Sequence, residues 1–122
     1  MLAYAREKMP DATFVQGDAI GLPFGDGAFE RLFTSYFYCH LEEGDRKRFL
    51  AEARRVAREL VIVPSQRDSG KLPAGYEERV LTDGSRWQVY KRYFEPQELL
   101  DELGGGELLF QGERYFLMVR SP

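Results

Sequence analysis

Three side chains in the first third of the chain are of types that can do chemistry. Asp18, after Gly17, follows the strand-like segment 13–16, and its carboxylate can accept hydrogen bonds from a ligand or cap the next turn. His40 is the only histidine, and because imidazole titrates near neutral pH it is a candidate general base. Tyr38 is a second, weaker candidate. A single histidine after a strand is more often a structural hydrogen-bonding residue, so that alternative stays open.

A strand, a helix and a second strand come after the Asp18 segment. Residues 29–38 contain a dense run of aromatic and β-branched residues, which predicts a strand. Gly44-Asp45 precedes an amphipathic helix, and 60–63 is a continuous apolar run ended by Pro64. Such a run is typical of a parallel strand that is buried on both faces. The order strand, helix, strand therefore predicts a parallel sheet with a crossover helix.

The predicted crossover helix has one apolar face and one charged face. The apolar face, which we expect to pack on the sheet, consists of Phe49, Leu50, Ala53, Val56 and Ala57. The charged face, expected to lie in solvent, consists of Arg46, Lys47, Glu52, Arg54, Arg55 and Arg58. Nearby acidic residues dilute its positive charge, so this pattern argues against nucleic-acid binding.

The flanking regions are predicted to form shorter elements of one domain, 1–122. A helix is predicted over residues 2–9, stopped by Pro10. The second half, 65–122, is predicted to contain a hairpin with its turn at Asp83-Gly84 and a helix from Pro96 through Leu103. It ends in an antiparallel strand pair, 108–110 with 115–119. The first half, 1–64, holds the strand–helix–strand unit.

Composition excludes several classes of protein. The chain has 122 residues, of which 43% are hydrophobic and 14% aromatic, enough for a packed core. Its net charge is −3, which gives no general attraction to nucleic acid or anionic lipid. One cysteine, Cys39, excludes an internal disulfide, and no His, Asp and Glu cluster has metal-ligand spacing. No apolar stretch is long enough to span a bilayer, so we expect a cytoplasmic protein.

Four motifs in the first half, taken in order, carry a resemblance to a known family. They are Met1-Leu2 with Ala5-Arg6, Phe14-Val15-Gln16-Gly17-Asp18-Ala19, Leu22-Pro23-Phe24 with Phe29-Glu30, and Glu52 with Arg55-Val56. The region 1–63 thus resembles the downstream part of a class I S-adenosylmethionine-dependent methyltransferase. The resemblance implies an α/β fold class, a partial Rossmann-like methyltransferase fold with a mainly parallel sheet and a C-terminal antiparallel strand pair.

The resemblance also implies a cofactor, S-adenosylmethionine, and residues that hold it. It assigns the adenine amine to the Asp18 carboxylate and the adenine ring nitrogen to the backbone N–H of Ala19. Ser35 and Tyr36 fall near the carboxyl end of the next strand, the edge where open α/β sheets place ligands. The cofactor-binding residues implied are Gly17, Asp18, Ala19, Leu22, Ser35 and Tyr36. The implied methyl acceptor is a small molecule. The segment 36–40 would line the cleft in which the methyl group is transferred to it.

One part of the family pattern is missing from the sequence. No strand followed by a glycine-rich loop and a helix precedes Met1, and this loop contacts the cofactor in the family. Gly25-Asp26-Gly27 opens no helix, and 104–106 comes after a helix, so neither replaces it. We therefore expect a truncated domain, in which cofactor binding by this chain alone is doubtful. The alternative is a non-catalytic Rossmann-remnant module for interaction or oligomerisation.

The missing strands also affect the edges of the sheet. In the family they lie between the strands that correspond to 13–16 and 29–38. These two segments must then pair directly or leave long edges unpaired. An unpaired edge offers backbone groups to another chain. We therefore expect a homo-oligomer or a strand-exchanged dimer.

Overall fold

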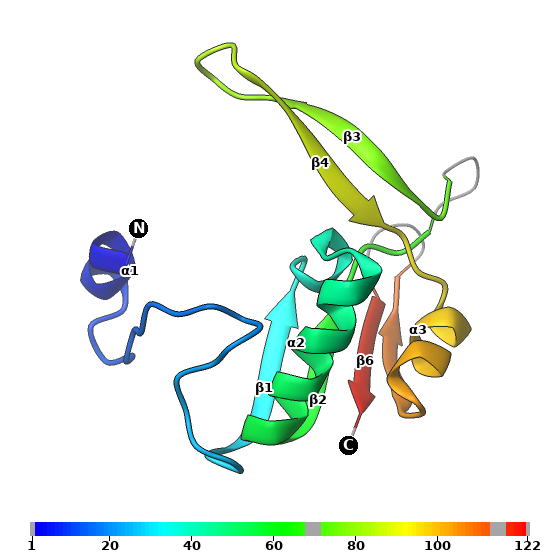
Figure 1. Ribbon diagram of the computed structural model, residues 1–122. Coiled ribbons are helices and arrows are strands. Elements are labelled where there is room, and N and C mark those ends of the chain that lie inside the picture. The colour runs from blue at the N-terminus through cyan, green and yellow to red at the C-terminus, as the bar shows by residue number, and fades with distance from the viewer. Residues whose placement is uncertain (1, 68–71, 113–116, 122) are drawn as a thin grey trace.

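A computed structural model describes residues 2–67, 72–112 and 117–121 (Figure 1). The α/β fold class is confirmed by its helices and sheet. The helices are α1 (Leu2–Lys8), the 3-10 helix η1 (Tyr38–His40), α2 (Glu43–Val56) and α3 (Pro96–Leu103). The strands are β1 (Phe29–Ser35), β2 (Ala57–Val63), β3 (Ala74–Val80), β4 (Arg86–Arg92), β5 (Glu107–Gln111) and β6 (Leu117–Ser121).

The main sheet is partial and mixed, with the strand order β1-β2-β6-β5. β1 and β2 are parallel, with Phe33 opposite Val61, and α2 makes the crossover between them. β6 is antiparallel to both β2 and β5. The predicted parallel unit and the C-terminal antiparallel pair are both confirmed, although 115 and 116 of that pair lie outside the described residues. α2 passes into β2 without a loop, because Val56 ends one and Ala57 begins the other.

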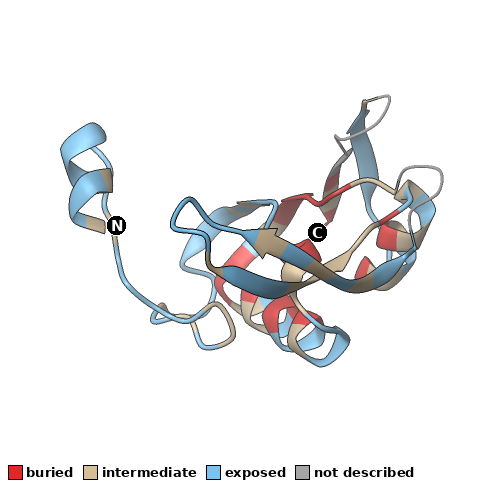
Figure 2. Cartoon of the chain, turned by 90° about the horizontal axis from the view of Figure 1, so that it is seen from above, coloured by how far each residue is buried: buried red, intermediate tan, exposed pale blue. Residues whose placement is uncertain are grey.

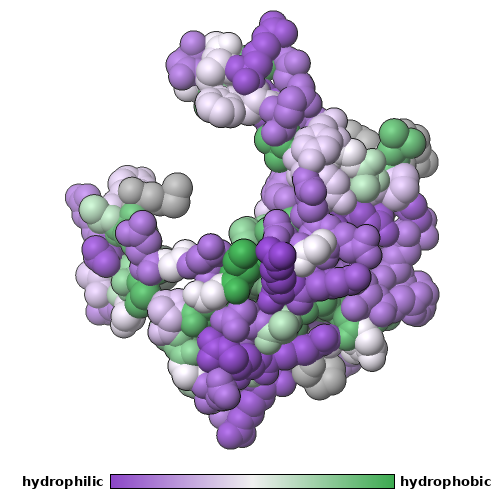
Figure 3. Space-filling model, viewed as in Figure 1, coloured by the Kyte–Doolittle hydropathy of each residue, from purple (hydrophilic) through white to green (hydrophobic). Residues whose placement is uncertain are grey.

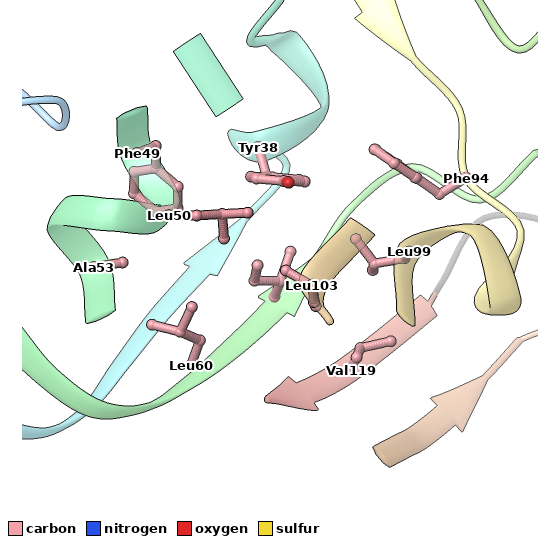
Figure 4. Packing of buried hydrophobic residues seen from close by; sticks show 10 residues of the cluster. Tyr38, Phe49, Leu50, Ala53, Leu60, Phe94, Leu99, Leu103 and Val119 are labelled. Atoms are coloured by element: carbon pink, nitrogen blue, oxygen red, sulfur yellow. The ribbon is translucent and has the colours of Figure 1, made fainter. Parts of the chain in front are cut away.

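The hydrophobic core lies between the sheet and the two helices that cover one of its faces (Figures 1 and 4). Continuous apolar residues in β2 leave both faces of that strand buried, as expected for a central strand. The fully packed cluster comprises Tyr38, Phe49, Leu50, Ala53, Leu60, Ile62, Phe94, Leu99, Leu103 and Val119. By contrast, α1 and the residues from 9 to 17 lie apart from this core and are largely exposed (Figure 2).

Arg46 corrects the predicted polarity of α2. The sequence places it on the solvent face, yet only 5% of the residue is exposed. Its Nε and Nη2 donate to Oε1 of Glu102 at 3.1 and 3.0 Å, and its Nη1 donates to the carbonyl of Leu41 at 2.9 Å. The Tyr38 hydroxyl donates to the same carboxylate at 2.5 Å. The physical reason is that α3 brings an acid opposite this position, which allows the guanidinium to be buried as a paired charge.

The strand predicted at 13–16 is wrong. These residues belong to no helix or strand, and Thr13, Val15 and Gln16 are exposed. A strand needs a neighbour to satisfy its backbone groups, and the segment does not pair with β1, which is an outer strand of the main sheet. Of the two arrangements expected for the edge, the described residues therefore show the unpaired one.

The predicted hairpin and C-terminal helix are confirmed. β3 and β4 form a separate two-stranded arm that projects from the body (Figure 1). Its turn contains Gly84, whose φ of 86° favours glycine, and the Asp83 carboxylate accepts from the backbone N–H of Ser85 at 2.8 Å. Gly104 ends α3 in the left-handed region, with φ 78°. No helix in the described residues has the length and apolar character needed to cross a membrane.

The buried Arg46 network predicts a large cost for its disruption. Arg46→Ala leaves the Glu102 carboxylate without its paired cation and the Leu41 carbonyl without its donor. We expect the free energy of unfolding to fall by about 3 kcal/mol. The measurement is urea denaturation followed by circular dichroism. The matched control is Arg48→Ala, which removes only an exposed pair with Asp45 and is expected to cost about 0.5 kcal/mol or less. Equal costs for the two variants would contradict the assignment.

Candidate functional site

A cavity of about 510 Å³ lies beside the turn that contains Asp18, next to the chain that leaves the carboxyl end of β1. Its lining residues come from that turn, from the segment after β1 and from the first turn of α2. They are Gly17, Asp18, Ala19, Ile20, Phe37, Leu41 and Asp45. Three of the sequence-predicted cofactor residues, Gly17, Asp18 and Ala19, are thus brought together. In the space-filling view the molecule has a broad hollow between α1 and the β3–β4 arm (Figure 3).

Asp18 is exposed and takes part in a tight turn. Its Oδ1 accepts from the backbone N–H of Ile20 at 3.1 Å, and its carbonyl accepts from the N–H of Gly21 at 3.0 Å. This is the turn-capping geometry that the sequence left open, and it occupies one carboxylate oxygen. Within residues 2–67, 72–112 and 117–121, no protein donor contacts the other oxygen, and the N–H of Ala19 meets no acceptor. The Asp18 turn therefore has one acceptor and one donor that protein groups do not use.

Apart from Asp45, the rest of the cavity wall is apolar and anchored to the core. Ala19 and Ile20 pack against the core cluster, as does Leu41. Phe37 makes an edge-to-face contact with Phe49 of α2, with ring centroids 5.7 Å apart. These contacts hold the cavity wall in place, so the cavity is suited to a flat apolar group with a polar edge.

Asp45 is a lining residue that sequence reasoning missed. Its side chain is about half exposed and lies 3.7 Å from Nη1 of Arg48. An acidic residue in the first turn of a helix is ordinary on charge grounds, so the sequence offers no signal that it borders a cavity. Only the fold places this turn of α2 opposite the Asp18 turn.

The loop after the Asp18 turn is attached to α2 by two side chains, Glu52 and Arg55, which we call the loop clamp. Arg55 donates from Nε to Oε1 of Glu52 at 2.8 Å and from Nη2 to Oε2 at 2.9 Å. Its Nη2 also donates to the carbonyl of Leu22 at 3.0 Å, and its Nη1 donates to the carbonyl of Phe24 at 2.8 Å and to Oδ1 of Asp26 at 2.9 Å. The backbone N–H of Leu22 donates to Oε2 of Glu52 at 2.7 Å.

The loop clamp also perturbs the titration of its members. The hydrogen bond from Arg55, followed by that from the backbone of Leu22, lowers the pKa of Glu52 to about 2. The carboxylate is therefore ionised throughout the neutral range. The sequence placed both side chains on the solvent face of α2, but each is only partly exposed. The pattern of an acid three residues before an arginine was the available signal, although it did not reveal the contact with the loop.

Leu22 is not brought into the Asp18 cavity. Its side chain lines a separate groove of about 260 Å³ along β1, together with Phe24, Phe29, Arg31, Leu32, Phe33 and Val56. Its backbone makes the contacts with α2, because the N–H donates to Glu52 and the carbonyl accepts from Arg55. The predicted cofactor contact of this side chain stays a prediction.

Ser35 and Tyr36 lie at the carboxyl end of β1 but do not line the cavity. The backbone N–H of Tyr36 donates to the carbonyl of Val63 at 2.7 Å, which extends the parallel ladder by one residue. Tyr36 has a φ of 54°, a left-handed conformation that costs a bulky residue about 1–2 kcal/mol. This bend turns the chain from β1 into η1 and so places Phe37 in the cavity wall.

The two candidate catalytic residues differ in accessibility. Tyr38 is fully buried in the core, and burial together with the hydrogen bond to Glu102 raises its pKa far above the usual value. Its hydroxyl therefore stays protonated and donates a hydrogen bond to Glu102 within the core. His40 is half-buried, with Nδ1 at 3.0 Å from the carbonyl of Tyr90 in β4. Because a carbonyl only accepts, Nδ1 carries a proton, which leaves Nε2 of the neutral ring as the basic nitrogen.

The comparisons with known proteins agree with this architecture. A family described as "Methyltransferase domain" matches residues 1–59. A demethylmenaquinone methyltransferase from Thermotoga maritima is 32% identical over 84 residues, which cover 62% of this chain and 36% of that protein. The chain therefore spans about a third of the length of this curated relative.

Solved structures show the same fold at low sequence identity. A DhpI-SAM-HEP complex matches with a TM-score of 0.75 and 18% identity over 99% of this chain and 63% of that one. An N1-methyltransferase from Burkholderia thailandensis, with bound 1,6-didemethyltoxoflavin and S-adenosylhomocysteine, matches with a TM-score of 0.68 and 14% identity. That match covers 98% of this chain and 54% of the other. Together, the family match over residues 1–59, the curated relative and the shared fold support a class I S-adenosylmethionine-dependent methyltransferase domain, of which this chain forms part.

Proposed function

We propose that this chain forms the adenine-binding side of an S-adenosylmethionine-dependent methyltransferase that acts on a small-molecule acceptor. The observation that carries the proposal is the cavity in which the Asp18 turn faces the apolar residues after β1. The names of the relatives support the class of reaction, since they include a demethylmenaquinone methyltransferase and an N1-methyltransferase of didemethyltoxoflavin. A non-catalytic interaction module, the alternative, is not favoured by these matches.

The cavity fits the chemistry of adenine. The exocyclic amine of adenine donates a hydrogen bond, and its ring nitrogens accept. The second carboxylate oxygen of Asp18 would accept from the amine, and the N–H of Ala19 would donate to a ring nitrogen. Ile20, Phe37 and Leu41 would cover the faces of the base. The described residues supply this side of the cofactor site, and the family's glycine-rich loop is not among them.

His40 is the proposed general base of the transfer. The bound cofactor supplies an electrophilic methyl group, so an acceptor hydroxyl or amine must lose its proton to react. The hydrogen bond from Nδ1 to the Tyr90 carbonyl orients the ring and keeps Nε2 basic. The β3–β4 arm thereby positions the base.

The partner of the β1 edge is proposed to be a second copy of the chain. β1 is one of the two outer strands of the main sheet, and Phe29 and Phe33 beside this edge are 42% and 59% exposed. Backbone pairing with another β1 would satisfy the edge and cover these rings. This homo-oligomer, including the strand-exchanged form of it, and a cytoplasmic location both stay predictions.

The adenine assignment predicts a loss of cofactor affinity in Asp18→Asn. Asparagine keeps the turn, since its amide oxygen also accepts from Ile20, but it presents an NH₂ group to the adenine amine. We expect the Kd for S-adenosylhomocysteine to rise about tenfold, equivalent to about 1.4 kcal/mol, in isothermal titration calorimetry. Asp11→Asn, an exposed position outside the cavity, is the control. No binding by the wild-type chain at millimolar ligand would overturn the proposed function.

The base assignment predicts a separation of binding from turnover in His40→Gln. Glutamine can still donate to the Tyr90 carbonyl but cannot take up a proton. We expect S-adenosylhomocysteine affinity within about twofold of wild type and methyl transfer about 100-fold slower. Transfer is measured as S-adenosylhomocysteine release with a panel of small phenols, quinols and amines. Unchanged turnover with the best acceptor would exclude His40 as the base.

The edge assignment predicts concentration-dependent association in sedimentation velocity. Phe33→Lys places a charge beside the β1 edge and is expected to shift the chain to monomer. Phe110→Lys is the matched control, because Phe110 is 52% exposed on β5, at the other side of the sheet. A wild-type chain that sediments only as a compact monomer, or equal effects of the two variants, would count against β1 as the interface.

A further inference from the structure

The turn 17–20 has little support from regular structure. The residues before it, 13–16, pair with no strand, and α1 lies apart from the core (Figure 1). The position of the turn opposite Phe37 and Leu41 therefore depends on the loop that comes after it. Packing of Ala19 and Ile20 on the core provides part of this support, but apolar contacts are non-directional and do not define the orientation of a backbone N–H.

The loop clamp supplies the directional part. Leu22, two residues after Ile20, is held at both its N–H and its carbonyl, by Glu52 and Arg55 respectively. Two further groups of the loop, the carbonyl of Phe24 and the carboxylate of Asp26, accept from the same guanidinium. The backbone N–H of Gly27 donates to the carbonyl of Arg55 at 2.7 Å, so the loop is tied to α2 at both ends.

The chemistry of the two side chains explains why this attachment is rigid. A planar guanidinium has five N–H donors in a fixed fork, and Arg55 uses Nε, Nη1 and Nη2 for four acceptor groups. Its pair with Glu52 is bidentate, which fixes the carboxylate so that one oxygen also receives the Leu22 N–H. A lysine has a single nitrogen at the end of a flexible chain and cannot reach this set.

We propose that Glu52 and Arg55 are positioning residues that hold the Asp18 turn in its ligand-binding orientation and thereby set the affinity for cofactor. The proposal rests on the proposed function of the turn. Neither side chain lines the cavity, so their effect on binding is transmitted through the backbone of the loop.

The experiment compares Arg55→Lys with Arg58→Lys. Arg58 is 75% exposed in its side chain and pairs only loosely with Glu30, at 3.8 Å, so it controls for the chemical change alone. We expect Arg55→Lys to raise the Kd for S-adenosylhomocysteine about tenfold, with a melting temperature within about 4 °C of wild type. Hydrogen exchange of the peptide that covers 17–27 is expected to speed up in Arg55→Lys and to stay unchanged in Arg58→Lys.

A second variant keeps the test independent of the arginine. In Glu52→Gln, an amide NH₂ in the place of Oε1 loses the contact with Nε of Arg55. An NH₂ in the place of Oε2 loses the contacts with both Nη2 of Arg55 and the Leu22 N–H, so every orientation loses at least one contact. This variant should reproduce the affinity and exchange changes at reduced size, whereas Glu43→Gln, which breaks an exposed pair with Lys47, should not. The proposal would be overturned if Arg55→Lys had the same hydrogen-exchange rate in residues 17–27 and the same Kd for S-adenosylhomocysteine as the wild-type chain.

The exchange measurement separates this proposal from the function on which it rests. If the wild-type chain binds no S-adenosylhomocysteine, the assignment of the turn to a cofactor fails and the affinity part of the proposal fails with it. The exchange comparison then still decides whether the loop clamp orders the turn. If the wild-type chain binds S-adenosylhomocysteine, and the loop-clamp variants have the same affinity and exchange as wild type, the cofactor assignment stands and the positioning role is wrong.

Discussion

The bidentate pair between Glu52 and Arg55 is the interaction on which the candidate site depends. It joins a helix that is firmly packed in the core to a loop that has no strand pairing of its own. Because the pKa of Glu52 is lowered to about 2, the pair stays charged under any physiological condition. The apolar packing of Ala19 and Ile20 keeps the turn near the core, and the charged contacts give its backbone one orientation.

A second network, formed around the buried Arg46, holds the other side of the site. It connects η1, α2 and α3 through the Glu102 carboxylate, and the arm attaches there through the pair of Tyr76 with Glu42 and the pair of His40 with Tyr90. The segment from Tyr36 to His40 is therefore fixed on one side by the core and on the other by the arm. The left-handed Tyr36 is compatible with this arrangement, because local strain persists where the surroundings determine the conformation.

Each of these two networks positions a different part of the candidate site. The loop clamp holds the loop after the turn with Asp18 and Ala19, the two residues proposed to bind adenine. The arm and η1 orient His40, the proposed general base, through its contact with the Tyr90 carbonyl. A larger surface depression, about 680 Å³, lies instead at the amino ends of β1 and β2, where its arginines pair with its glutamates. Open α/β sheets bind ligands at the carboxyl ends of their strands, which favours the smaller cavity.

Most regular elements could be predicted from the sequence, because their signals are local. The apolar run 60–63, the turn at Asp83-Gly84 and the helix from Pro96 carry their own patterns, and each was confirmed. The segment 13–16 also has a strand composition, but a strand exists only when another strand accepts its hydrogen bonds. That partner is a tertiary feature, so the prediction was wrong.

The site shows the same division between sequence and structure. By itself, the sequence determined which family the chain resembles and singled out the turn with Gly17, Asp18 and Ala19, which lines the cavity. Only the tertiary structure decided that Phe37, Leu41 and Asp45 face this turn and that Leu22 lines another groove. It also decided that Arg46 is buried and that Arg55 is held against the loop. A charged side chain has the same local pattern in either environment. Whether it is buried depends on an acceptor that arrives from a distant part of the chain.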